Sequence, residues 1–270
     1  MTVDTNVIRG QLRNLPAILY VLLMAVFIFL PVAVLVQYSF QDGMLPVPPF
    51  KGFSLRWYER VFGNERLIAA LWNSVLVGGL SSLMATALGF LAAYGLARKQ
   101  PRGAAAIQFG LMAPITVSYL IIGMGLQIVS NQLGLEKSLL LVGIGHVVIN
   151  LPLAFAILYS QLGEHQANVE RAAHDLGASD LQALILVTVP MLWPALLAAF
   201  FISFTLSWDE FVIAFLLSRF DVTLPVIIWS MLRTGLNPEL NAAGTLVFGT
   251  SILLVVLVEL LLRRGRRLRG

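Results

Sequence analysis

The chain has 270 residues, of which 58% are hydrophobic and only 12% are charged, and its formal net charge is +4. A soluble globular domain is usually about one quarter charged, so this composition excludes that class and predicts an all-α integral membrane protein. Cysteine is absent, which excludes disulfides and thiolate metal sites. The basic residues flank apolar runs, as in a membrane protein rather than a nucleic-acid-binding one.

Uncharged runs long enough to cross a bilayer recur along the chain. A spanning helix needs about 20 apolar residues. We expect transmembrane helices at about 15–40, 68–97, 104–133, 138–162, 181–208 and 240–262. The first run follows Arg9 and Arg13, but it is too long for a signal peptide and no cleavage pattern follows it. It is therefore predicted to be retained, within a single transmembrane domain over 1–270.

Basic residues predict the orientation. The connection at Arg98, Lys99 and Arg102 and the terminal run 263–269 lie on the same side as the N-terminus, and that side is the more basic. By the positive-inside rule this side is cytoplasmic, so both termini and the loop 164–180 face the cytoplasm. The run 263–269 fits a topology anchor on anionic lipid headgroups.

Two patterns inside the spans concern packing and bending. Small residues recur every fourth position along the second span: Ser81, Ala85, Gly89, Ala93 and Ala97. Such a stripe lets another helix approach closely. Prolines interrupt the third, fourth and fifth spans: Pro114, Pro152, Pro190 and Pro194. Each can kink its helix, which suits a transport path, although proline is also common in membrane helices generally.

One polar stretch, 164–180, interrupts the apolar sequence. Asn168 can cap a first short helix, and Gly177 can end it in a left-handed conformation. Ser179 then begins a capping box with Gln182. We expect two short helices with a sharp turn between them. Such an elbow suits docking of a soluble partner, and a plain connecting loop is the alternative.

The segment 209–239 follows the fifth span on the outer side and is partly apolar, which predicts a hairpin-like segment that dips toward the membrane. Trp208, Asp209 and Glu210 stand where it begins. Carboxylates near the hydrophobic zone usually face a bundle interior or a wet cavity, and acids beside an indole can attract an organic cation. Interfacial anchoring is the alternative. Two weaker candidates for the substrate pathway are Tyr119 and Trp229.

His146 and Asn150 are four residues apart in the fourth span, so they share one helix face. They could line a pathway, but we favour an interhelical hydrogen bond. An intramembrane hydrolase would need a nucleophile and a base in register. The available pairings, such as Ser203 with His146, have no motif around them.

Family resemblance enters with residues 171–177, Arg-Ala-Ala-His-Asp-Leu-Gly, followed at the expected distance by Val-Thr-Val-Pro at 187–190. This resembles the EAA loop of permease subunits of binding-protein-dependent ABC importers. The family pattern starts with glutamate, whereas this chain has Arg171 there and Glu170 one position earlier. Three further stretches look like the spermidine/putrescine branch: 208–213, 224–231 and 237–242.

The resemblance implies a bacterial inner-membrane protein with the type I ABC importer permease fold, six transmembrane helices and cytoplasmic termini. The helix 168–176 would be the coupling helix that docks an ATPase. The implied docking residues are Asn168, Glu170, Arg171, Ala172, Ala173, Asp175, Gly177 and Ala178. The implied partners are two cytoplasmic ATP-binding subunits, a second homologous permease in a hetero-pair, an external solute-binding protein and membrane lipid, without nucleic acid. The implied cargo is a small cationic solute such as putrescine or spermidine.

The chain has no ATPase site of its own in its sequence. A Walker A motif needs Gly-Lys followed by Ser or Thr, and none of the lysines, at 51, 99 and 137, follows a glycine. ATP and Mg would therefore be bound by partner subunits, and no cofactor is expected here. The alternatives are a permease for a different small organic solute and an ion-coupled secondary transporter. The latter usually has more spans and an internal repeat, and a channel would need a filter motif.

Overall fold

The computed structural model describes residues 5–235 and 237–267, and it describes the side chains of 16–235, 237–253 and 255–256. The regular secondary structure of the described chain is helical, with loops between the helices and an isolated antiparallel bridge between Gln41 and Phe53. It divides into two compact units, residues 1–63 with 231–249 and residues 64–230 with 250–270. The all-α prediction is confirmed for the described residues.

The first unit contains α1 (Thr5–Ser39), α2 (Arg56–Gly63) and the start of α12 (Pro238–Arg267). The loop between α1 and α2 is organised by Gln41. Its side-chain oxygen accepts the Lys51 N–H at 3.0 Å, and its backbone carbonyl accepts the indole N–H of buried Trp57 at 2.6 Å. These bonds tie the loop to α2.

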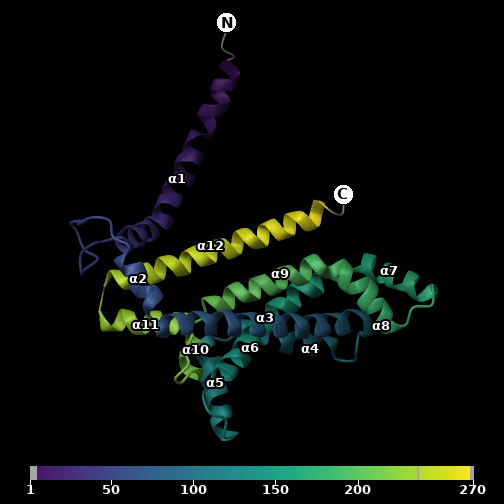
Figure 1. The fold of residues 1–270 in the computed structure, drawn as a ribbon. Helices are drawn as coiled ribbons and strands as arrows, with labels where there is room; N and C mark the ends of the chain where they lie inside the picture. Colours follow the sequence, from purple (N-terminus) through teal and green to yellow (C-terminus); the bar gives the residue numbers. More distant parts are fainter. Residues whose placement is uncertain (1–4, 236, 268–270) are drawn as a thin grey trace. The chain divides into compact units, whose positions relative to one another are not determined.

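The second unit is centred on three long helices: α3 (Glu65–Lys99), α6 (Leu139–Gln161) and α9 (Val189–Trp208) (Figure 1). A Cβ at Gly89 of α3 would lie 2.8 Å from the backbone nitrogen of Phe155 on α6, so only glycine fits this contact. Ala85 and Ala93 on the same stripe are fully buried. The predicted close approach along this stripe is confirmed.

The predicted third span is not one straight helix. It consists of α4 (Ala104–Met112), the 3-10 turn η1 (Ala113–Thr116) and α5 (Tyr119–Gln132), with a bend of 107°. Pro114 lies in η1, where it has no N–H to continue the α-helix. Ser118 then begins α5 by accepting the Leu120 N–H on its side chain. The kink expected at Pro114 is present, and α4 with α5 would make one bent span, so the span at 104–133 stays a prediction.

Shorter elements lie at the two ends of the α3–α6–α9 core. At one end are α7 (Glu164–Asp175), α8 (Asp180–Ala183) and the π-helix η2 (Leu184–Thr188), which leads into α9. At the other end are α10 (Val212–Leu217) and the start of α11 (Leu224–Thr234). The loop between α10 and α11 is held to α3, since Asn73 donates to the Val222 carbonyl at 3.0 Å and Ser74 accepts the Leu224 N–H at 2.8 Å.

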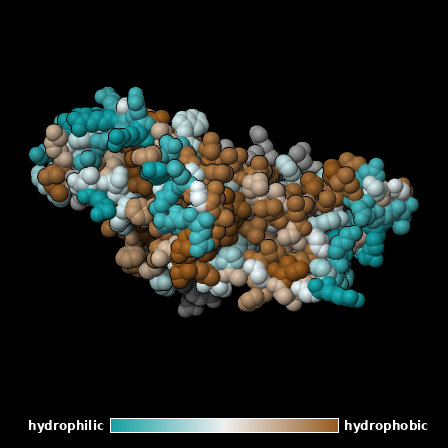
Figure 2. Space-filling view, turned by 90° about the horizontal axis from the view of Figure 1, so that it is seen from below, coloured by the Kyte–Doolittle hydropathy of each residue, from teal (hydrophilic) through white to brown (hydrophobic). Residues whose placement is uncertain are grey.

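Four helices of the described chain are long and apolar enough to cross a membrane: Pro16–Ser39, Glu65–Lys99, Leu139–Gln161 and Asp180–Trp208. The bent α4–α5 pair would make a fifth. The predicted sixth span, 240–262, falls within α12, and part of it lies outside the described side chains. Six spans with cytoplasmic termini stay a prediction. Figure 2 shows hydrophilic side chains gathered at the α7–α8 end, on the right, and hydrophobic ones along the helices beside it.

Candidate functional site

The polar stretch 164–180 forms the predicted elbow of two short helices. Gly177 has a φ of 92°, in the left-handed region, and the Ala178 N–H returns to the Ala173 carbonyl at 3.0 Å. Ser179 and Gln182 form the predicted capping box, with each side chain accepting the other residue's backbone N–H. The two helices are thus joined by a defined turn, and these capping predictions are confirmed.

The start of the elbow differs from the prediction. The first helix, α7, begins at Glu164 rather than at Asn168, and the residue before it, Gly163, is extended. Asn168 lies inside α7, where its side-chain oxygen accepts from the Arg171 guanidinium. The reason is that α6 ends at Gln161, so the chain turns within two residues and Glu164 meets the positive helix end. The predicted Asn168 cap was therefore wrong.

Glu170 of α7 is held inside the second unit by two side chains from other helices. Arg98, near the end of α3, donates to its two carboxylate oxygens at 2.6 and 3.1 Å. Thr188, the last residue of η2 just before α9, donates to the same carboxylate at 2.8 Å. Arg98 also donates to the Leu162 carbonyl after α6, at 3.2 Å. We call Arg98, Glu170 and Thr188 the α7 anchor.

The α7 anchor fixes the elbow to the ends of three helices. The side chains of Arg98 and Glu170 are 15% and 7% exposed, so the pair is largely removed from water. Removing one partner of such a pair leaves an uncompensated charge and costs about 3–5 kcal/mol. Glu170 therefore supports α7 from within, instead of presenting its carboxylate on the surface. The local sequence pattern did not identify Arg98 as its partner.

Thr188 reaches Glu170 from a wide helical turn. Over η2 the backbone is π-helical, and the Val189 N–H bonds to the Leu184 carbonyl, five residues earlier. Pro190 follows directly and has no N–H to donate. π-helical turns are rare and often occur at functional sites. Here the turn contributes a buried hydroxyl to the α7 anchor.

The remaining docking candidates lie on the accessible side of the elbow. Arg171, Ala172, Asp175 and Gly177 are exposed, and Asn168 with them, whereas Ala173 and Ala178 are half-buried. The most exposed large apolar side chain of this loop is Leu176, at 91%. The sequence analysis did not select it. The available signal was a lone leucine between polar residues just before the glycine turn.

At the opposite end of the core, the pathway candidates separate into two groups. Asp209 is exposed, and Tyr119 and Trp229 are 40% and 42% exposed. Trp208 and Glu210 are only 3% and 5% exposed. The Trp229 ring lies 5.4 Å from that of Phe211, two residues after Asp209. Tyr119 is in none of the ring contacts between described side chains.

Glu210 leads into a buried chain of polar side chains. Its carboxylate accepts the backbone N–H groups of the first turn of α10: Val212 at 2.8 Å, Ile213 at 3.0 Å and Ala214 at 3.2 Å. His146 Nε2 lies 3.3 Å from Glu210 Oε2, close enough for an ionic contact but not aligned as a hydrogen bond.

The other ring nitrogen of His146 continues this chain into the core. Nδ1 bonds to the Ser207 hydroxyl of α9, which lies 3.3 Å from the Ser81 hydroxyl of α3. The predicted interhelical hydrogen bond of His146 is confirmed, but its contact with Glu210 was not foreseen. Asn150, one turn further along α6, is buried and has no hydrogen-bond partner among the described side-chain contacts. We call Glu210, His146, Ser207 and Ser81 the polar core chain.

The helical architecture, with four helices of the described chain long and apolar enough to cross a membrane, is that of a multi-pass membrane protein. Residues 85–267 match the family of binding-protein-dependent transport system inner membrane components. The chain therefore belongs to this family of ABC importer permeases.

Two curated relatives are similar over most of their length. The putrescine transport system permease protein PotI of Escherichia coli (strain K12) is 30% identical over 272 residues, covering 96% of each chain. The spermidine/putrescine transport system permease protein PotC of Haemophilus influenzae is 31% identical over 240 residues, 88% of this chain and 93% of the relative.

Solved structures show the same fold. A bacterial ABC transporter that imports alginate matches with a TM-score of 0.66, 20% identity and 98% coverage of both chains. The alginate transporter in complex with its pentasaccharide-bound periplasmic protein matches with a TM-score of 0.73, 19% identity and 96% coverage of both chains. The predicted type I importer permease fold is confirmed at this level.

Family membership settles several expectations. The chain is a multi-pass inner-membrane transport subunit of a bacterial ABC importer and is not itself an ATPase. ATP is bound by separate ATPase subunits, and permeases of this family bind no cofactor. The importer also includes a periplasmic binding protein, as in the alginate system.

Proposed function

We propose that this permease forms half of the translocation pathway for a small organic cation, a polyamine such as putrescine or spermidine. The names of the relatives at 30% and 31% identity support this substrate class. The exposed carboxylate of Asp209 and the nearby Phe211–Trp229 ring pair support it chemically, since a carboxylate and aromatic faces both attract ammonium groups. The second half of the pathway would come from a homologous permease, in a hetero-pair.

The same proposal assigns the elbow to energy coupling. With the termini on the cytoplasmic side, α7 would face a cytoplasmic ATPase subunit, and each of two such subunits would contact one permease. The observation that carries this assignment is a rigidly anchored helix that ends in an exposed apolar side chain. Glu170 is bound by Arg98 and Thr188, while Leu176 is 91% exposed. A partner that buries Leu176 would therefore move α7 together with the helices to which it is anchored.

Leu176→Asp tests the docking assignment in the assembled importer. Burial of a leucine in an interface contributes about 1.5–3 kcal/mol, so a charged replacement should weaken ATPase capture by at least about tenfold. The measurement is affinity capture of the ATPase subunits by the tagged permease, together with ATP-driven uptake in vesicles. Phe220→Asp is the matched control, because Phe220 is also strongly exposed, at 83%, but lies at the α10 end. Equal capture by both variants would reject the assignment of α7.

Uptake of labelled putrescine tests the substrate class separately. Asp209→Asn removes the exposed charge next to the Phe211–Trp229 pair and should raise the KM for putrescine by about tenfold or less, with little change in maximal rate. The importer should not transport an uncharged diol of the same length. Unchanged kinetics in Asp209→Asn would remove Asp209 from the pathway, and transport of the diol would point to a different solute.

A further inference from the structure

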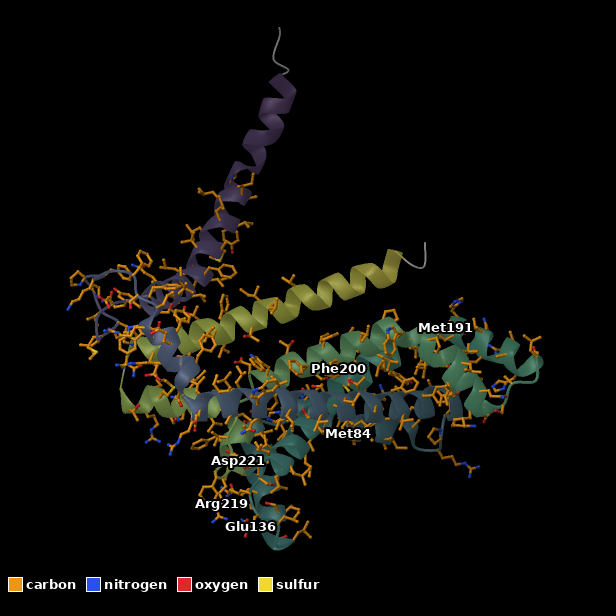
Figure 3. All side chains as sticks on the ribbon, viewed as in Figure 1. Met84, Glu136, Met191, Phe200, Arg219 and Asp221 are labelled. Carbon is orange, nitrogen blue, oxygen red and sulfur yellow. The ribbon has the colours of Figure 1, made fainter. Side chains whose placement is uncertain are left out.

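The short helix α10 is fastened to α6 at both of its ends. At its start, the Glu210 carboxylate binds the first-turn N–H groups and contacts His146 of α6 at 3.3 Å. At its end, the Leu217 carbonyl accepts the N–H of Ser138, the residue that caps α6, at 3.0 Å. A peripheral pair, Arg219 with Glu136, adds a contact of 3.0 Å close to this second fastening (Figure 3). The two helices are thus held side by side in opposite directions.

We call the surface of α5 and α6 against which α10 packs, around Gly123 and Gly145, the seat of α10. Ile213, Ala214 and Leu217 are fully buried. A Cβ at Gly145 of α6 would lie 2.4 Å from Ile213 Cγ2, and one at Gly123 of α5 would lie 2.7 Å from Leu216 Cδ1. The Leu216 side chain could rotate away from a residue larger than Gly123, but Ile213 is branched next to its backbone, so Gly145 is the position that lets α10 approach α6 this closely. A small displacement of α10 would therefore break several contacts together.

We propose that Glu210 and His146 are positioning residues of this permease. As a buried pair they hold α10 between α5 and α6. They thereby set the positions of Asp209 and of the Phe211–Trp229 pair, which are the solute-contacting groups of the proposed function. Glu210 itself does not contact the solute, because three backbone N–H groups bind its oxygens and the His146 ring lies 3.3 Å from Oε2. This assignment rests on the proposed pathway only for its effect on transport, since the seat of α10 is a property of the fold.

His146 also connects this seat to the other two helices of the core. Its second nitrogen bonds to Ser207 of α9, and Ser207 contacts Ser81 of α3. The polar core chain therefore gives α10 a fixed position relative to all three long helices. If α10 moved alone, the contacts between these deeply buried side chains would separate and leave polar groups unpaired, which opposes such a movement.

A single introduced cysteine can report on the seat, because the chain has no cysteine of its own. The reporter is Ala214→Cys, a small change at a fully buried position of α10. In the assembled importer, in membrane vesicles, this thiol should react slowly with a membrane-impermeant maleimide. Adding Glu210→Gln removes a charged acceptor of several hydrogen bonds and should speed labelling by at least about tenfold. His146→Leu should have a similar effect, and His146→Gln, which keeps a polar amide, a smaller one.

The control is Glu136→Gln with the same reporter, because that carboxylate is 82% exposed and its loss should change labelling by less than about twofold. Ser207→Ala gives a milder test should Glu210→Gln fail to assemble, with an expected rise of about threefold. Labelling that stays as slow as in the parent in both Glu210→Gln and Ser207→Ala would overturn the proposal.

Transport kinetics separate positioning from simple loss of stability. Glu210→Gln should raise the KM for putrescine more than it lowers the maximal rate, whereas Asp209→Asn should raise the KM without speeding labelling. If the parent importer takes up no polyamine, the proposed function is rejected, but the labelling test of the α10 seat stays valid. Faster labelling with an unchanged KM would reject the positioning role.

Discussion

The two ends of the α3–α6–α9 core each bury one glutamate, but different kinds of group bind its carboxylate. At the α7 end, Glu170 meets the guanidinium of Arg98 and the hydroxyl of Thr188, all side chains from separate helices. At the α10 end, Glu210 meets mainly backbone N–H groups of the helix that it begins, and only His146 comes from another helix.

This difference indicates how each end is attached to the core. An arginine–carboxylate pair with two parallel bonds fixes the geometry between α7 and α3, and the Thr188 hydroxyl ties the same carboxylate to the segment that leads into α9. A carboxylate that caps its own helix stabilises mainly that helix, and here only the His146 side chain links this carboxylate to another helix. The α7 end is therefore attached through side-chain bonds to other helices, whereas α10 is held mainly by its packing between α5 and α6. The largest effects of substitution are therefore expected at the α7 anchor.

Breaking the α7 anchor should have the largest effect. Arg98→Met leaves Glu170 buried without its cation and should destabilise the permease by about 3–5 kcal/mol. Arg98→Met combined with Glu170→Met should recover much of this loss, because two apolar side chains tolerate burial. The measurement is thermal unfolding of the purified importer in detergent, followed by ATP-driven uptake. If the double variant is no more stable than Arg98→Met, the charge pair is not the basis of the anchor.

Filling the α10 seat should have an intermediate effect. Gly145→Ala places a methyl group 2.4 Å from Ile213 Cγ2 and should cost about 1–3 kcal/mol as α10 shifts. Gly143→Ala is the matched control on the same helix, since nothing lies within 4 Å of its Cβ position. The control should be neutral or stabilise by up to about 1 kcal/mol through helix propensity. Equal unfolding temperatures for the two variants would show that α10 is not tightly seated.

The peripheral pair should have the smallest effect. Arg219 and Glu136 are 54% and 82% exposed, and exposed ion pairs contribute about 0–1 kcal/mol. Arg219→Gln should therefore change the unfolding temperature slightly, and raising the salt concentration should abolish even that difference. A loss comparable to that of Arg98→Met would contradict the contrast between buried and exposed pairs.

Local features of the sequence predicted local features of the structure well. The turn at Gly177 and the Ser179–Gln182 capping box depend on residues within one or two helical turns, and both were predicted from those residues. The Asn168 cap failed because the helix start also depends on where the preceding span ends. Pro114 indicated a kink, but the sequence around it did not predict that the bend would be as large as 107°.

The contacts that define the sites were less accessible from sequence. Arg98 and Glu170 are 72 positions apart, and His146 and Ser207 are 61 apart. Many polar residues of the chain compete as partners over such separations, and helix packing decides which of them meet. Glu210 illustrates the consequence: its sequence neighbours favour a solute contact, whereas three backbone N–H groups in fact occupy its carboxylate.

The π-helical turn at 184–188 makes the residue count of this segment matter. In an α-helix each residue rotates the next by about 100°, and a π-helical turn accommodates one residue more than an α-turn does. Deleting a single residue from Leu184 to Val187 would restore an ordinary winding and still leave an uninterrupted apolar helix. Thr188 would keep its place relative to α9 but lose its register with α7, so its hydroxyl could no longer meet Glu170. Such a deletion would keep the apolar helix but remove one of the two side chains that bind Glu170, and so loosen α7 without changing any residue of α7.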